Sequence, residues 1–481
     1  MLRVLGSVKR ACDGLSRRDL LIAGGLNAVA GAIGSGLQPV ALAAPNAGRA
    51  KSVICLFLFG GVSSIDTFDL KPEAPEEIRG EFHPISTSVP GLQISNYLPE
   101  LAKRMDRLAL VRSVTSTESN HDYCTTLTGH PGRVSLLVPS EGDWPFFMSA
   151  IEHVHDRQRV ARRANGLPAN VCLPNRINLL QGTPQAGPYG GFLGRRYDPL
   201  CTRINGNGEP LNRMQSVAPK RLDFALQGTE LNSEMTLDRL NLRRSLLEQF
   251  DGQRRAVESH PVVDSFDRGQ SLAFDLIASA ATRRALDLNQ EPFELRERYG
   301  WNLFGQSALL ARRLVQAGVP LVTAVWDSTK NVELGNDISH RSWDTHWDHY
   351  KACKGWLLPG FDQTASALLD DLSDRGMLEE TLVVILSEMG KTPRVNKDGG
   401  RDHWVSAYSA LFAGAGIRGG VVHGRTDSIA ANVASDPVSP QDLLATVYHC
   451  LGIGTDATIP DAVGRPILLY DTGDPVRPIL C

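Results

Sequence analysis

Continuous apolar runs recur along the chain and predict the strands of a buried sheet. The first run covers residues 52–59 and ends in Gly60-Gly61, which is typical of a parallel strand buried on both faces. Similar runs cover residues 108–114, 321–326, 382–386 and 407–412. Helical periodicity lies between them, at residues 98–105, 305–317 and 361–376, and Gly376 suits the end of the last helix. Strands that alternate with helices predict an α/β fold with a mostly parallel sheet covered on both faces.

The pattern becomes irregular between Gly129 and about Ser265. Prolines are frequent there, and residues 187–194 are rich in glycine. We interpret residues 130–265 as an insertion that lies over the sheet. A long, loop-rich excursion from a compact domain is typical of a lid or cap that shapes a substrate site. Inert packing material is the alternative interpretation.

The N-terminal segment has the pattern of an export signal. Basic residues and the pair Arg17-Arg18 precede an apolar, glycine-rich and alanine-rich stretch at residues 20–42, and Ala41-Leu42-Ala43 provides a cleavage site. We therefore predict a twin-arginine signal over residues 1–43 and a periplasmic or other extracytoplasmic location. The glycines and Pro39 make the stretch a poor membrane helix, so we expect no stable membrane span after cleavage, with retention as an anchor as the alternative.

Length and composition limit the domain organisation and the kinds of molecule that the protein can bind. Residues 44–481 are numerous enough to bury a large core, and we predict that they form a single domain. The formal net charge of -3, from 50 basic and 53 acidic residues, provides no basic field for nucleic acid, so we expect no nucleic-acid partner.

The cysteines of the mature chain are scattered and contain no CxxC pair, which excludes a cysteine metal cluster. They are Cys55, Cys124, Cys172, Cys201, Cys353, Cys450 and Cys481. Because seven is an odd number, the sequence allows one or two disulfides with at least one free thiol in an exported protein.

Polar clusters follow the predicted strands, where α/β sheets bind their ligands. They cover residues 60–69, 119–122, 343–349, 387–394 and 399–404. Together they supply both carboxylates and imidazoles: Asp66, Asp344, His346, His349, Glu388, Asp402 and His403. This mixture predicts a divalent metal, with zinc or manganese favoured over calcium or magnesium. Any one cluster alone is typical of a solvated loop.

In this order, the clusters resemble the DUF1501 family of exported proteins, which belongs to the alkaline phosphatase superfamily together with the sulfatases. The resemblance covers nearly the whole mature chain. Its most specific segments are residues 60–68, 111–129, 343–346, 387–394 and 397–404. It implies an alkaline-phosphatase-like three-layer sandwich.

The resemblance also implies a two-metal site. Asp66 would serve one metal, and Asp344 with His346 the other. Glu388 stands where the superfamily has the aspartate of an Asp-His pair, while Met389 replaces the imidazole. His403 matches the final histidine of the superfamily, and Asp402 would orient it.

The superfamily nucleophile lies nine residues before a Thr-Gly pair, and counting back from Thr128-Gly129 gives Ser119. Ser119 is equally suited to cap a helix, and His121 is a further ligand or proton donor. The mechanism implied is hydrolysis of a phosphate or sulfate ester. In it Ser119 attacks, a metal stabilises the developing charge, and Lys391, Arg394 or Arg401 holds the anion.

The substrate expected for such an enzyme is a small anionic ester or a sulfated or phosphorylated glycan. The chain contains no Cys-x-Pro-x-Arg motif, which excludes the usual formylglycine nucleophile of sulfatases. The alternative function is an exported, non-catalytic binding or scaffold protein that keeps the fold and at most one structural metal.

Overall fold

The computed structural model describes residues 48–117, 123–131, 139–158, 167–174, 186–205, 223–226, 279–327, 342–470 and 472–481. All of them belong to one compact unit, Asn46–Cys481. The predicted signal at residues 1–43 lies outside the described residues.

A nine-stranded sheet forms the centre of this unit, in the order β13-β4-β12-β9-β1-β8-β5-β6-β7. The strands are β1 (Ser52–Leu58), β4 (Leu108–Val114), β5 (Asn170–Leu173), β6 (Leu200–Asn205), β7 (Asp223–Leu226), β8 (Leu321–Trp326), β9 (Thr381–Leu386), β12 (Tyr408–Gly414) and β13 (Val421–His423). Only β7 and β12 run against the others in this described sheet. The five strands predicted from apolar runs are confirmed, and the sheet is mostly parallel.

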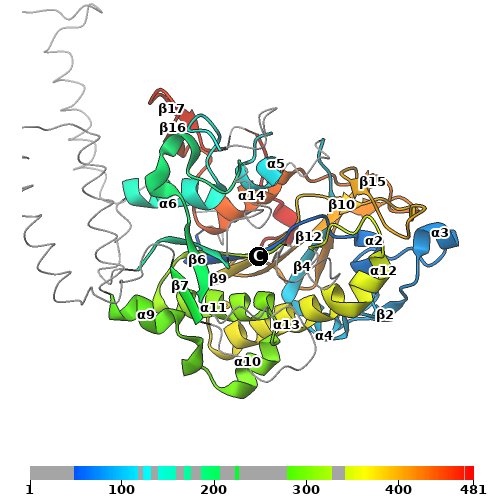
Figure 1. Ribbon diagram of the computed structural model, residues 1–481. Coiled ribbons are helices and arrows are strands. Elements are labelled where there is room, and N and C mark those ends of the chain that lie inside the picture. Colours follow the sequence, from blue (N-terminus) through cyan, green and yellow to red (C-terminus); the bar gives the residue numbers. More distant parts are fainter. Residues whose placement is uncertain are drawn as a thin grey trace, which may run out of the picture. The chain divides into compact units, whose positions relative to one another are not determined.

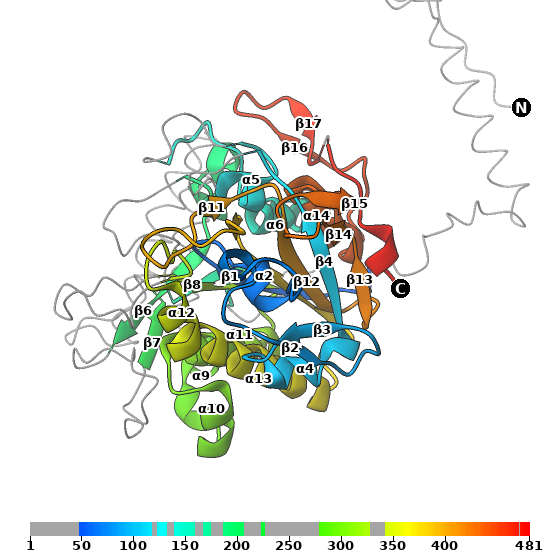
Figure 2. The ribbon, with the colours of Figure 1, turned by 90° about the vertical axis from the view of Figure 1, so that its right-hand side faces the viewer.

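The two faces of β1 belong to two separate cores. Ile54, Leu56 and Leu58 pack with α11 (Leu303–Ala317), α13 (Leu358–Asp374) and α4 (Pro99–Ala102). Val53, Cys55 and Phe57 pack with α5 (Tyr123–Thr128), α6 (Phe147–Arg157) and α14 (Pro440–Cys450). Helices therefore cover both faces of the sheet (Figures 1 and 2). This arrangement confirms the predicted three-layer α/β fold.

The helices predicted from periodicity are found with small changes. The segments at 305–317 and 361–376 form α11 and α13, and Gly376 follows α13 with a φ of 65°. Residues 98–105 form only the short α4, and a 3-10 turn follows at Met105–Arg107.

Short elements complete the described part of the unit. The helices are α2 (Ser64–Thr67), α3 (Glu76–Arg79), α9 (Ala280–Leu286), α10 (Phe293–Tyr299) and α12 (His349–Ala352). The two-stranded ribbons pair β2 (Pro84–Ser86) with β3 (Gln93–Ser95), β10 (Gly390–Lys391) with β11 (His403–Trp404), β14 (Arg425–Thr426) with β15 (Val433–Ser435), and β16 (Thr458–Pro460) with β17 (Pro466–Leu468).

The interpretation of residues 130–265 as an insertion over the sheet is wrong for their described part. That part supplies β5, β6 and β7, which extend the sheet beyond β8. It also supplies α6, which covers one face. The strands β5 and β7 contain only four residues each, so their apolar patterns are too short to stand out among the surrounding prolines.

The sequence left the pairing of the cysteines open. Seven cysteines are described, and no disulfide joins any two of them. Six of them are buried, where cysteine packs as a small apolar residue. Within the described residues, no helix combines the length and the apolar character needed to cross a bilayer.

A buried ion-pair network joins the helices on one face of the sheet. Arg312 of α11 is fully buried, and its guanidinium lies 2.9 Å from Glu291 Oε1 and 2.7 Å from Asp371 Oδ2. Tyr299, the last residue of α10, donates to the same Asp371 oxygen at 3.0 Å. Because Asp371 belongs to α13, the network fixes α10, α11 and α13 to one another.

We expect Arg312→Met to lower the free energy of unfolding by about 1.5–3 kcal/mol, because it removes the buried guanidinium that joins Glu291 and Asp371, although Arg313 and Arg375 stay with these carboxylates. Urea unfolding followed by circular dichroism measures the change. Arg465→Met is the matched control: Arg465 pairs with Asp461 at 2.8 Å, but its side chain is 78% exposed. The control should cost less than about 1 kcal/mol. Equal losses in the two variants would contradict the role assigned to the network.

Candidate metal centre

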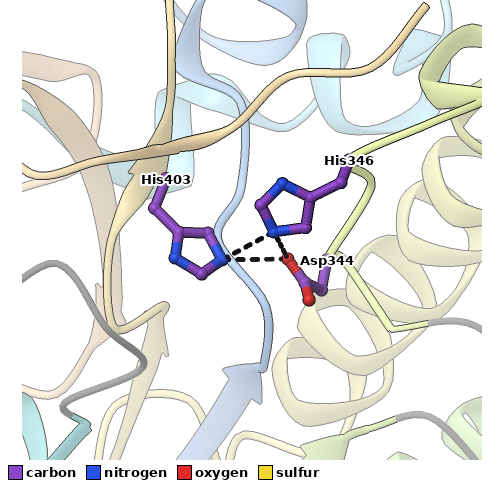
Figure 3. A group of neighbouring side chains, drawn as sticks. All are labelled: Asp344, His346 and His403. Carbon is purple, nitrogen blue, oxygen red and sulfur yellow. Dashed lines mark hydrogen bonds and ion pairs between the residues drawn. The ribbon is translucent and has the colours of Figure 1, made fainter. Parts of the chain in front are cut away.

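Three donor atoms converge beyond the carboxyl end of β1 (Figure 3). His346 Nε2 lies 3.0 Å from Asp344 Oδ1 and 3.0 Å from His403 Nε2. His403 Nε2 lies 3.1 Å from the same Asp344 oxygen. Bonds of ~2.0–2.1 Å to a tetrahedral ion place its ligand atoms roughly 3.3 Å apart. The triangle is therefore close to the size that one metal ion requires.

A glycine allows the loop with two of these residues to cross the end of β1. Asp344 and His346 precede α12, and Trp343 N–H donates to Phe59 O at 2.9 Å. Gly60 has a φ of 115°, and a Cβ there would lie 2.2 Å from Asp344 N. Any other residue at position 60 would force this loop away from the strand.

The third ligand comes from the ribbon of β10 and β11. Lys391 and His403 are directly opposite one another in this ribbon. The loop between the two strands packs against the first ligand loop at Gly400, where a Cβ would lie 1.8 Å from His346 O. Asn396 Nδ2 donates to the same oxygen at 2.9 Å. Backbone contacts thus fix His346 and His403 relative to each other.

The donor set fits a divalent metal ion. Two imidazoles and one carboxylate are ligands that zinc accepts in catalytic sites, where a further position stays open. Asp402 Oδ1 lies 2.7 Å from His346 Nδ1, which directs His346 Nε2 into the triangle. The hydrogen bond to His346 lowers the pKa of Asp402. Asp402 was predicted to orient His403, but its contact is with His346.

Lys391 places a buried ammonium group at the edge of the triangle. Its side chain is fully buried, and its Nζ donates to Asp344 Oδ1 at 2.8 Å. Burial lowers the pKa of Lys391, while the Asp344 carboxylate opposes this shift. The side chains of Asp344 and His346 are each 30% exposed, so solvent and small solutes reach the centre.

Glu388 lies at the same edge of the sheet but outside the group of three. Its Oε1 accepts from Gly60 N–H at 2.7 Å, and its Oε2 accepts from Ser387 Oγ at 3.3 Å. Ser387 Oγ also donates to Leu58 O at 2.7 Å. Glu388 therefore ties the end of β9 to the end of β1.

Asp66, which the family resemblance implies as the ligand of a second metal, lies outside the group of three ligands. Arg401 Nε lies 2.7 Å from Asp66 Oδ2, and Arg401 Nη2 lies 3.1 Å from Asp66 Oδ1. His349 Nε2 is 2.9 Å from Oδ2, and Ser63 Oγ donates to the same atom. Both carboxylate oxygens are thus engaged by protein donors in a fully buried position.

The structure also separates the three cations that were predicted to hold an anion. Lys391 lies in the centre, whereas Arg401 is buried against Asp66. Arg394 is 68% exposed and pairs with Glu77, and its role in holding the anion stays a prediction. Ser119 and His121 lie outside the described residues.

Sequence reasoning missed the pairing of Asp66 with Arg401 and the contact of His349 with Asp66. These partners are separated by 335 and 283 residues. Each residue was recognised as part of a polar cluster, but spacing along the chain carries no signal for which clusters meet.

Asp66 should make a defined contribution to acid stability. Burial disfavours the charged form of Asp66 and raises its pKa. Arg401 and His349 outweigh this effect and lower the pKa of Asp66 from 3.8 to about 2. Its contribution is present above pH 4 and is lost as the pH falls from about 4 to about 2. We expect the stability difference between wild type and Asp66→Asn to shrink by roughly 2 kcal/mol over this interval. Urea unfolding at stepped pH measures it; a constant difference would contradict the expectation.

Several solved structures are distantly similar to this chain. The PsFucS1 sulfatase from Pseudoalteromonas sp. is 11% identical with a TM-score of 0.37, and the match covers 97% of this chain and 78% of that one. The phosphonate monoester hydrolase SpPMH from Silicibacter pomeroyi is 12% identical with a TM-score of 0.36, over 90% and 76% of the two chains. The lipoteichoic acid synthase LtaP from Listeria monocytogenes is 9% identical with a TM-score of 0.35, over 91% and 81%. These values are too low to transfer an activity.

A search of curated protein sequences gives no match. The family described as "Protein of unknown function (DUF1501)" matches residues 50–480. This range contains every strand of the central sheet and all three residues of the candidate metal centre. The chain belongs to the DUF1501 family.

Proposed function

We propose that this protein is an exported, metal-dependent hydrolase of phosphate or sulfate esters. The observation that carries the proposal is the convergence of Asp344, His346 and His403 beside the buried ammonium of Lys391. The group lies beyond the carboxyl ends of parallel strands, which is where α/β sheets bind ligands. Carboxylate, imidazole and ammonium together suit a centre that binds a metal and an anionic substrate.

Each residue of the centre has a separate task. Asp344, His346 and His403 would hold the ion, which supplies positive charge to an ester oxygen. Asp402 holds the ring of His346 in place. Lys391 would bind a second oxygen of the anionic group, because its buried ammonium already faces the ligand carboxylate.

The proposed nucleophile is Ser119. The strand β4 runs parallel to β9 and β1, because both β4 and β9 are antiparallel to β12. It therefore ends at the same edge of the sheet as the metal centre, and Ser119 follows the last residue of β4, Val114, by five positions. In the proposed reaction the Ser119 oxygen bonds to phosphorus or sulfur, the alcohol leaves with a proton, and water then releases phosphate or sulfate. His121 is the proposed proton donor.

The proposed substrate is a small anionic ester or a sulfated or phosphorylated glycan. The proposed location is outside the cytoplasm, and the twin-arginine pattern at residues 1–43 supports it. The twin-arginine route carries folded cargo, which suits a protein that takes up its metal before export.

Metal analysis of the purified mature protein tests the centre. We expect bound zinc or manganese in wild type and its loss in Asp344→Ala, because that change removes the only carboxylate among the three described ligands. Plasma mass spectrometry after dialysis measures the metal per chain. Asp398→Ala is the matched control, since Asp398 is an exposed carboxylate on the loop between β10 and β11. Wild type without metal would end the proposal.

Substitution of the nucleophile tests catalysis separately from metal binding. We expect Ser119→Ala to lower hydrolysis of aryl phosphate or aryl sulfate esters by on the order of 10³-fold or more, while the metal content stays at the wild-type level. Arg465→Ala is the control, since Arg465 is 78% exposed and pairs with Asp461, and its turnover should stay within about twofold. Equal turnover in wild type and Ser119→Ala would remove Ser119 from the mechanism.

One observation favours a second candidate, an exported binding or scaffold protein with a single structural metal. Asp66 is engaged by Arg401 and His349, so the described residues contain one group of metal ligands rather than two. In that case the metal analysis would give one ion per chain, no ester would be hydrolysed, and chelation would lower the melting temperature.

A further inference from the structure

A closed cluster of charged side chains lies behind the candidate metal centre. Arg401 is at its middle, fully buried, and its guanidinium contacts both oxygens of Asp66. Arg401 Nη2 also donates to Ile78 O at 2.9 Å and contacts Tyr350 OH at 3.0 Å. Arg401 Nη1 donates to Thr392 O at 3.1 Å and to Pro393 O. The guanidinium is thus held by partners from several segments of the chain.

Protein donors engage both oxygens of Asp66 in this arrangement. Its Oδ2 faces Arg401, His349 and Ser63, and its Oδ1 faces Arg401. A planar guanidinium bound to a carboxylate by two nitrogen atoms is a strong and geometrically specific pair. The side chain of Asp66 is 1% exposed and that of Arg401 is fully buried, so a metal that bound Asp66 would lie against a buried cation, which like charge disfavours.

The cluster is connected to the ligands on both sides of the centre. Arg401 N–H donates to Thr345 O at 3.0 Å, and Thr345 lies between the ligands Asp344 and His346. Arg401 itself is two residues before the ligand His403. The main chain at Arg401 therefore links the two ligand loops.

His349 makes a second connection to the same ligand loop. Its Nε2 lies 2.9 Å from the Asp66 carboxylate, which only accepts, so this nitrogen carries a proton. Burial lowers the pKa of His349, although Asp66 opposes the shift. The other ring nitrogen, Nδ1, lies 2.6 Å from Thr345 Oγ1. A continuous chain of hydrogen bonds thus runs from Asp66 through His349 to the segment that holds Asp344 and His346.

We infer that the metal centre is mononuclear, with Arg401 as a fixed cation in place of a second ion, and that Asp66, His349 and Arg401 position the three ligands. The inference rests on the proposed metal site at Asp344, His346 and His403. It assigns Asp66 a positioning role rather than a ligand role. Among the described residues, one ion and Lys391 would then face the anionic substrate.

Zinc titration of the full mature protein tests the inference. Zinc per chain is counted by plasma mass spectrometry, and the Kd is measured by competition with a chromophoric chelator. We expect one zinc per chain in wild type and in Asp66→Asn, with a Kd about 10–100-fold weaker in the variant, as for other residues that orient metal ligands. Asp344→Ala should bind no zinc.

Asp69→Asn is the matched control for Asp66→Asn. Asp69 lies on the same segment and is also buried, but it contacts Lys71, Arg112 and Thr426 rather than the ligand loops. We expect it to lower the melting temperature without changing the zinc Kd. Thr345→Val is the milder test if Asp66→Asn does not fold, because it removes only the hydroxyl that contacts His349; its Kd should weaken severalfold.

Three results would overturn the inference or a part of it. Two zinc ions in wild type, with one lost in Asp66→Asn, would overturn the inference and leave the proposed hydrolase intact. An unchanged zinc Kd in Asp66→Asn, or in Thr345→Val if the first variant does not fold, would overturn the positioning role. Wild type that binds no zinc or manganese would end both the inference and the proposed function.

Discussion

The parallel pairing of β1 with β8 and β9 is the constraint on which the rest of the structure depends. Each strand is apolar on both sides and is buried by helices on the two faces, so the backbone can leave the sheet only at its ends. The segments after β1 and β9 therefore leave at the same edge. Polar groups that are hundreds of residues apart in sequence lie together there, because the interior of the sheet is filled by apolar side chains.

Close backbone contact turns this edge into a site with defined geometry. Gly60 and Gly400 each lie where a Cβ would collide with the ligand loop, so the loops touch through their main chains and not through adjustable side chains. Rigid loops of this kind suit a metal centre, since ligand atoms must be held within about half an ångström of their bonding positions.

Charges are paired in two layers at this edge, an outer layer around Asp344 and an inner layer around Asp66. Asp344 is half-buried and meets Lys391 together with two imidazoles, and Asp66 is fully buried and meets Arg401. The outer layer has partly exposed donor atoms. The inner layer has none, because burying an unpaired carboxylate would cost several kcal/mol. The same residue types thus form the candidate centre in one layer and support it in the other.

The sequence by itself determined the fold class, five of the strands, α11 and α13, because continuous apolar runs and helical periodicity report burial directly. The order of the polar clusters carried the resemblance to the family. Asp344, His346, His403 and Lys391 were candidates because they stand in clusters that follow predicted strands. Only the tertiary structure decided that β5, β6 and β7 extend the sheet, that Arg394 lies on the surface, and that Asp66 pairs with Arg401. Short strands carry little periodicity, and the choice of partner for a buried charge depends on distances in space that spacing along the chain does not encode.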